Sequence, residues 1–151
     1  MVQLYHGSYN MFDRFDPNAS KKTEYGHGFY ASDYGGDCLE YMSEAVYGDK
    51  PGYMYEFEVP DQAFQDRWLK SSEPAVGPQI DRLIATLRED GNDKLADRIE
   101  NDPHRDFDPA TAPPDQRTTQ AHVMSWIGKG ADKTDFYRRA GIDGYHEGNY
   151  Y

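Results

Sequence analysis

The stretch from Gly26 to Tyr41 holds residues that could form the wall of a ligand pocket. Its sequence, GHGFYASDYGGDCLEY, places the aromatic pair Phe29 and Tyr30 just after two glycines and sets Tyr41 eleven residues beyond Tyr30. The segment FYAS at 29–32 is typical of a short strand. Aromatic side chains flanked by glycines and an acidic turn are well suited to lining a pocket, so we expect a binding site here.

The residues after this strand predict a helix. Ser32 and Asp33 are residue types that cap helices, and the helix is expected to start near residues 34–37. Spacings of three and four place several side chains on one helix face: Cys38, Tyr41, Met42 and Ala45. Tyr41 is therefore expected to point back toward the strand that carries Tyr30.

A histidine at the N-terminus is the second candidate for chemistry. Residues 2–6 alternate loosely and end at Gly7-Ser8, which predicts a short strand with His6 at its end. Taken alone, such a histidine is most often hydrogen-bonded for structure. Near the other end of the sequence lie Glu147 and Asn149. Taken alone, each of them is most often a surface turn residue.

Composition limits the partners of such a site. The 151 residues include 16 Lys and Arg against 27 Asp and Glu, which gives a net charge of −11 and a pI near 4.7. This charge repels phosphate backbones and anionic lipid, so general nucleic-acid binding is not expected. Aromatic residues make up 15% of the chain although mean hydropathy is −0.97, which indicates a globular domain with an aromatic-rich core.

The length and the single cysteine predict one domain in a reducing compartment. A chain of 151 residues can bury one core, so we expect a single domain over 1–151. Cys38 has no cysteine partner within the chain. No apolar run reaches membrane-spanning length, and the N-terminal residues do not resemble a signal peptide. These features favour a cytoplasmic protein without a membrane partner.

The remaining segments predict a mixture of strands and helices. Residues 53–59 alternate strictly and form the clearest strand, with one buried face and one glutamate-bearing face. A loop anchored by Trp68 is expected at 62–72, a proline-rich loop at 101–116, and a turn at Asp143-Gly144. Helices are expected over four segments: 78–90, 93–100, 119–127 and 132–140.

Three of these motifs resemble a known enzyme family. LYHGS at 4–8, GFYASD at 28–33 and Tyr41 resemble the diphtheria-toxin-like branch of the ADP-ribosyltransferases, the H-Y-E group. Two later motifs, YMYEFEVPD at 53–61 and AGIDG at 140–144 with a following NYY, are similar to the transferase domains of phage and mobile-element polyvalent proteins.

This resemblance covers residues 4–68 and 136–151. It implies an α+β fold in which a split, mostly antiparallel β-sheet surrounds an NAD cleft, with a helical insertion at about 78–128. Transferases of one core differ mainly in attached loops and helices, so the unmatched residues 69–135 are where target recognition is expected.

The resemblance also implies a role for each motif. Nicotinamide leaves NAD through a transition state with oxocarbenium character, so the site must hold the ring and favour positive charge on the ribose. Tyr30 and Tyr41 would sandwich the nicotinamide, the Gly7 backbone would bond its carboxamide, and His6 would bond a ribose hydroxyl. No metal is required. The implied NAD-binding residues are His6, Gly7, Ser8, Phe29, Tyr30, Ser32 and Tyr41.

The catalytic acid is less clearly placed. The H-Y-E glutamate usually stands directly before an aromatic or apolar residue of the last core strand, and here that position is Asn149. Glu147 lies two residues earlier, one strand period away, so both side chains would face the same side. We assign the acid to Glu147, which with His6 and Tyr30 completes the catalytic set, because only a carboxylate can stabilise positive charge. Asp143 is next in line.

The expected function is NAD-dependent mono-ADP-ribosylation of a target protein. The chain would then be an effector of a phage or mobile element, such as an anti-CRISPR protein, acting in the cytoplasm of the producing or infected cell. Two alternatives remain: an NAD glycohydrolase, and an inactive NAD- or protein-binding module, which applies if Asn149 holds the acid position. Modification of nucleic acid is disfavoured by the net charge of −11.

Overall fold

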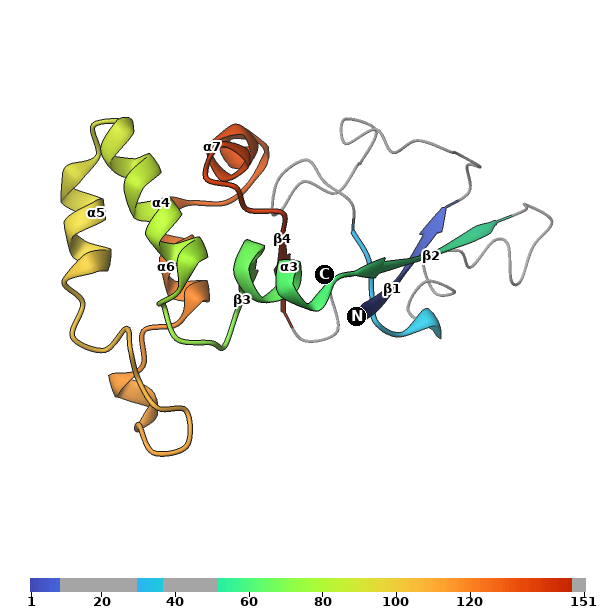
Figure 1. Cartoon of the computed structure of the whole chain (residues 1–151), viewed down its shortest axis with the longest axis horizontal. Helices are drawn as coiled ribbons and strands as arrows, with labels where there is room; N and C mark the ends of the chain where they lie inside the picture. The colour runs from blue at the N-terminus through green and yellow to red at the C-terminus, as the bar shows by residue number, and fades with distance from the viewer. Residues whose placement is uncertain (9–29, 37–51, 148–151) are drawn as a thin grey trace.

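The computed structural model of the chain describes residues 1–8, 30–36 and 52–147 (Figure 1). Helices and small sheets are mixed in these ranges, in agreement with the α+β class expected from the sequence. The elements are β1 (Val2–Ser8), β2 (Tyr53–Val59), α3 (Asp61–Arg67), β3 (Trp68–Lys70), α4 (Pro78–Glu89), α5 (Asp93–Glu100), η2 (Pro114–Gln116), α6 (Gln120–Ile127), η3 (Ala131–Lys133), α7 (Thr134–Arg139) and β4 (Gly144–His146). Within the described ranges, no helix combines the length and the apolar character that crossing a membrane requires.

The two long strands form an antiparallel ribbon. β1 pairs with β2 from Val2 opposite Val59 to Ser8 opposite Tyr53. Burial alternates strictly along β2, which confirms the strand and the two faces predicted from its sequence. On the other edge of β1, Tyr5 forms an isolated antiparallel bridge with Ser32, so the segment 30–36 lies beside β1.

The second sheet is short and parallel. β3 pairs with β4 in a register that sets Trp68 opposite Gly144 and Lys70 opposite His146. The loop predicted at 62–72 is therefore wrong, because α3 and β3 occupy most of it. β3 is buried on both faces, so its three residues lack the alternation by which a strand is recognised. The turn expected at Asp143-Gly144 is also wrong at its second residue, which begins β4.

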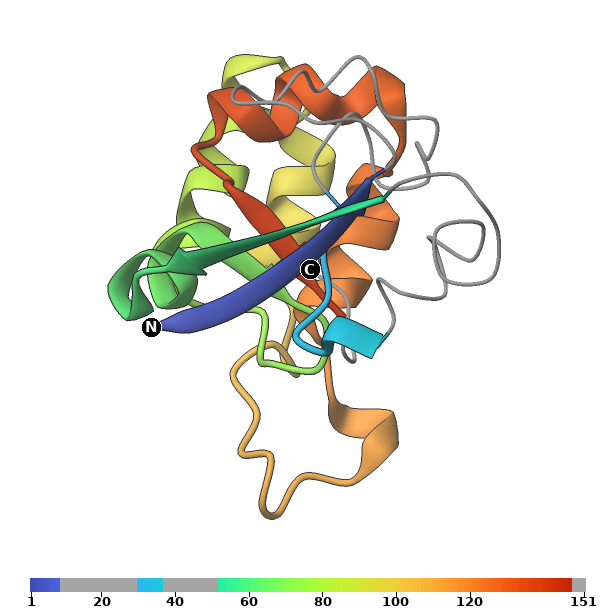
Figure 2. The ribbon, with the colours of Figure 1, turned by 90° about the vertical axis from the view of Figure 1, so that its right-hand side faces the viewer.

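Four helices enclose the larger core. α4, α5, α6 and α7 occupy the segments in which helices were expected, and fully buried side chains such as Leu83, Ile99 and Val123 lie among them. Thr119 caps α6 through a capping box with His122, at the start of the helix expected over 119–127. Beyond these helices, the segment 101–117 projects from the body of the molecule (Figure 2). It contains the short 3-10 helix η2, where no regular element was expected.

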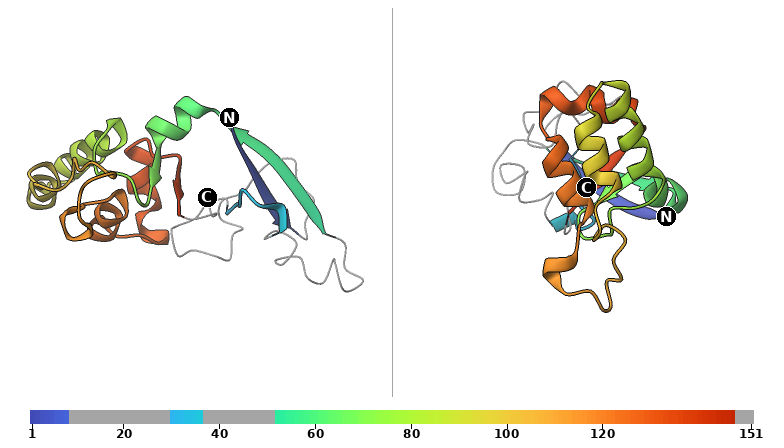
Figure 3. Two further views of the ribbon diagram at one scale, coloured as in Figure 1. Left: turned by 90° about the horizontal axis from the view of Figure 1, so that it is seen from below. Right: turned by 90° about the vertical axis from the view of Figure 1, so that its left-hand side faces the viewer.

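Trp68 joins the helical part to the β1–β2 ribbon. Its side chain belongs to a small core with Leu4 of β1 and Ala31 of the segment 30–36. Phe64 of α3 packs against the same cluster. Figures 1 and 3 show α3, β3 and β4 between the helices and the ribbon. Trp68 thereby holds β1, near the N-terminus, close to β4, near the C-terminus.

Candidate functional site

The candidate site begins where His6 meets Tyr30. Tyr5 and Ser32 exchange two backbone hydrogen bonds, of 2.7 and 2.9 Å, which align the segment 30–36 with β1. One residue further along β1, His6 Nδ1 lies 2.5 Å from the carbonyl oxygen of Tyr30. A carbonyl oxygen only accepts, so Nδ1 carries the hydrogen and the neutral ring has Nε2 as its acceptor. The structure therefore brings together two of the three residues assigned to catalysis.

The backbone of Gly7 is directed at the same edge of β1. Peptide groups alternate along a strand, and those of Tyr5 point to Ser32. The N–H and C=O of Gly7, two residues on, therefore point to the edge where Tyr30 lies. The Tyr30 carbonyl is hydrogen-bonded to the His6 side chain. The regular backbone pairing of β1 with the segment 30–36 is therefore interrupted at Gly7, the residue whose backbone is expected to bond the carboxamide of NAD.

The two serines have different positions. Ser32 is 3% exposed, and its Oγ accepts a 3.0 Å hydrogen bond from the N–H of Tyr34. Helical backbone begins at Gly35, which agrees with the helix start expected near residues 34–37. Ser8 ends β1 opposite Tyr53 and is half-buried. Ser32 thus fixes the turn after Tyr30, whereas Ser8 lies farther along the ribbon.

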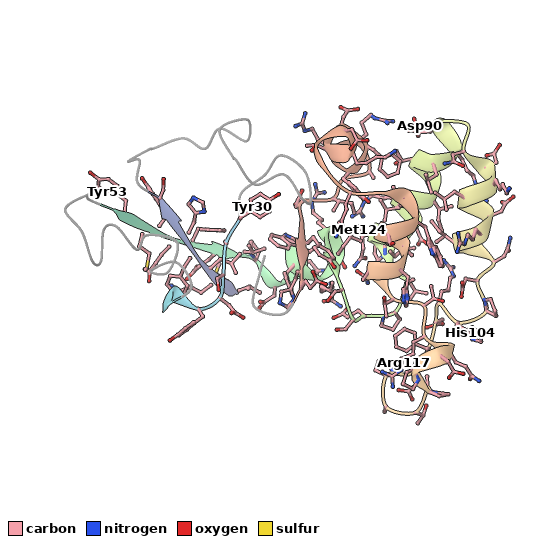
Figure 4. All side chains as sticks on the ribbon, turned by 180° about the vertical axis from the view of Figure 1, so that it is seen from behind. Tyr30, Tyr53, Asp90, His104, Arg117 and Met124 are labelled. Atoms are coloured by element: carbon pink, nitrogen blue, oxygen red, sulfur yellow. The ribbon has the colours of Figure 1, made fainter. Side chains whose placement is uncertain are left out.

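Of the aromatic residues expected to line the pocket, Phe29, Tyr30 and Tyr41, the structure describes Tyr30. In Figure 4 the Tyr30 side chain projects from the segment 30–36 on the side that faces the helical part. Its ring is half-buried. Phe29, Tyr41 and Asn149 lie outside the described residues. Tyr41 is the residue expected to cover the second face of the nicotinamide. Their roles remain predictions.

The two acids considered for catalysis differ in their contacts. Asp143 receives two hydrogen bonds from Arg67, of 2.7 and 3.0 Å, and its backbone N–H donates to the Arg67 carbonyl. This bidentate pair ties the start of β4 to the end of α3. Glu147 follows β4 directly, is exposed, and interacts with the hydroxyl of Tyr145. Asp143 is thus engaged in holding the fold, whereas Glu147 contacts Tyr145 of β4.

Tyr145 is a neighbour of Glu147 that the sequence did not single out. Burial, the negative charge of Glu147 and a hydrogen bond to its carboxylate together raise the pKa of Tyr145 to about 12. A hydrogen bond with Ser71 acts in the opposite direction. The phenol is thus protonated at neutral pH and donates to Glu147, which orients the carboxylate.

Tyr55 is the second residue that sequence reasoning missed. It lies opposite His6 in the β1–β2 register, and the two ring centroids are 6.4 Å apart with the planes tilted by 46°. Alternation alone places Tyr55 on the buried face of its strand. Its pairing with His6 could not be read, because residues 9–52 separate the two strands and leave their register open.

Other features of the described surface carry no comparable chemistry. A shallow depression of about 460 Å³ on α5 is lined by Asn92, Lys94, Leu95 and Arg98, and contains none of the predicted site residues. In the ranges 1–8, 30–36 and 52–147, no group of three or more His, Cys, Asp or Glu side chains could hold a metal ion.

Comparison of the chain with protein-family models, with curated proteins and with solved structures finds no significant match in any of the three. The case for a function therefore comes from the residues and their geometry.

Proposed function

We propose that this chain is an NAD-dependent mono-ADP-ribosyltransferase that modifies a protein. The observation that carries the proposal is the 2.5 Å contact between His6 Nδ1 and the Tyr30 carbonyl. It links the two motifs, YHGS and GFYASD, on which the resemblance to the H-Y-E group depends. Two residues that lie 24 positions apart in the sequence, and that the motifs assign to one site, are neighbours in the fold.

In this proposal His6 positions the substrate and transfers no proton. Its Nδ1–H is engaged by the Tyr30 carbonyl, which sets the ring orientation. The proposed task of Nε2 is to accept a hydrogen bond from a ribose hydroxyl. A fixed acceptor lowers the entropy cost of holding the ribose in a reactive orientation. Gly7 contributes peptide groups at the same edge, where a carboxamide can be bonded.

Bound NAD supplies the glycosidic bond that breaks when nicotinamide leaves and ADP-ribose is transferred. The proposed task of Glu147 is to favour positive charge on the ribose, because a carboxylate held next to the ribose stabilises the cation that develops there. Tyr145 donates to this carboxylate and limits its orientations. Tyr30 provides an aromatic face for the nicotinamide, with Tyr41 as the proposed opposite face.

One assay with purified chain separates the candidate activities. The chain is incubated with NAD labelled in its adenylate part, with and without a bacterial lysate, and both free nicotinamide and label on protein are measured. Transfer predicts both signals. Nicotinamide release without labelled protein would assign an NAD glycohydrolase, and the absence of both signals would favour an inactive binding module.

Variants connect the assay to the site. His6→Ala and Tyr30→Ala are each expected to lower turnover about 100-fold, in line with lost positioning. Gln3→Ala is the matched control, since Gln3 is exposed on the same strand and faces away from His6. Turnover equal to that of the unmodified chain in both site variants would remove the NAD site from this part of the molecule.

A further inference from the structure

The face of the β1–β2 ribbon that carries His6 changes character along its length. At one end, paired apolar residues pack against Trp68 and Phe64: Val2 with Val59, and Leu4 with Phe57. Beyond Leu4 the same face continues with His6 opposite Tyr55, and then with Ser8 opposite Tyr53. The ribbon therefore passes from a packed core to a polar and aromatic surface at His6.

Tyr55 is an aromatic neighbour of His6 on this face. In an antiparallel ladder, side chains of directly opposite residues project to the same side of the sheet, and the His6 and Tyr55 rings lie 6.4 Å apart. Tyr55 is half-buried. Its neighbours along the strand, Met54 and Glu56, are exposed on the opposite face, so Tyr55 alone of these three accompanies His6.

We propose that Tyr55 is a substrate-binding residue that packs its ring face against the ribose of NAD, at the edge of the nicotinamide and beside His6. This inference rests on the function proposed above. An aromatic ring presents a negative face, which attracts the positively charged nicotinamide and any positive charge that develops on the ribose. A contact of this kind depends on the ring and not on the phenol hydroxyl.

The proposal predicts a distinct order among variants of Tyr55. Tyr55→Phe keeps the ring and is expected to bind NAD as the unmodified chain does. Tyr55→Leu keeps apolar bulk but loses the ring, and Tyr55→Ala loses both. Each of these two is expected to weaken NAD binding roughly tenfold, the size of one desolvated cation–π contact. Glu56→Gln, one residue away on the opposite face, is the matched control.

Two measurements on the whole chain test this order. The Kd for NAD is followed by ligand-observed NMR titration, and the His6 ring protons are followed in the same samples. Those protons are expected to shift when the Tyr55 ring is removed, since the ring lies beside them. A dispersion of the other resonances equal to that of the unmodified chain shows that the variant is folded.

The outcomes separate this inference from the proposed function. If the unmodified chain binds NAD and Tyr55→Leu binds it equally well, Tyr55 has no role in binding, and the assignment of His6 and Tyr30 stands. If the unmodified chain neither binds NAD nor releases nicotinamide, the proposed function fails and this inference fails with it. Weaker binding by Tyr55→Phe, equal to that of Tyr55→Leu, would overturn the ring-face contact.

Discussion

The indole ring of Trp68 lies directly across Gly144. A Cβ atom at Gly144 would meet three atoms of that ring at 2.6 Å, a distance that real Cβ contacts do not show. The two residues are also register partners in the β3–β4 sheet. Trp68 in turn packs with Leu4 and Ala31, so the approach at Gly144 lets one side chain contact β1, the segment 30–36 and β4 together.

Replacing Gly144 by alanine is therefore expected to destabilise the protein. The added methyl group overpacks the contact with Trp68, which typically costs about 1–3 kcal/mol of the free energy of unfolding. Urea unfolding measures the loss. Gly35→Ala is the control, because a Cβ there would meet Met54 only at ordinary contact distances of 3.8–3.9 Å. Equal stability of the two variants would contradict the packing of Trp68 on Gly144.

Arg82 of α4 is predicted to fix the ends of two other helices. Its guanidinium donates to the carbonyls of Asp66 in α3, at 2.7 Å, and Ala140 after α7, at 2.9 Å. Arg82→Met keeps the apolar stem but leaves both carbonyls without this donor, and a loss of about 1–3 kcal/mol is expected. Arg88→Met removes exposed ion pairs on the same helix and should cost much less stability than Arg82→Met. Thermal unfolding of both variants ranks the two arginines, and a reversed order would show that Arg82 does not hold these helices.

Much of the helical part could be predicted from the sequence, because its signals are local. Apolar spacing of three and four residues predicts α4, and Thr119 marks the start of α6. β2 could be predicted for the same reason, since its alternation is complete. β3 could not be, because its three buried residues carry no period and its pairing with β4 joins segments distant in the sequence.

The candidate site divides in the same way. The motifs single out His6 and Tyr30, which are in contact in the structure. Their roles in a site remain predictions. The Tyr55 and Tyr145 positions depend on register and on burial against distant segments, which no local pattern specifies. The Arg67 pair of Asp143 likewise joins residues from two parts of the chain, and it lowers the rank of Asp143 as a catalytic acid.

The contact between His6 and Tyr30 predicts one imidazole tautomer. Because the Tyr30 carbonyl accepts from Nδ1, neutral His6 should carry its hydrogen on Nδ1 and not on Nε2. Nitrogen-15 NMR distinguishes the two forms directly. His6→Asn offers an amide donor in nearly the same place and should keep more activity than His6→Ala. A ring with its hydrogen on Nε2 would show that the His6–Tyr30 contact is absent in solution.

Tyr145 is expected to make stability depend on alkaline pH. Its pKa is raised from 10.0 to about 12 in the folded protein, first by burial and then by the charge and hydrogen bond of Glu147. The unfolded chain therefore loses this proton first, and the stabilisation present below pH 10 is lost as the pH rises from 10 to 12. Tyr145→Phe should lose stability less steeply over that range, as measured by unfolding at fixed pH values. An unchanged slope would exclude a raised pKa for this phenol.

Glu147 is the residue on which the proposed chemistry depends most. Glu147→Gln keeps the shape of the side chain and removes its charge, so nicotinamide release should fall by at least about 100-fold while NAD binding is retained. The pKa of Tyr145 should fall in the same variant, because the charge that raises it is gone; alkaline absorbance titration detects this change and confirms that the substituted residue lies beside Tyr145.

Asp143→Asn is the matched control. It breaks the exposed Arg67 pair, whose side chains are 48% and 45% exposed, so little stability should be lost and turnover should be retained. Full activity of Glu147→Gln together with an inactive Asp143→Asn would transfer the catalytic role to Asp143.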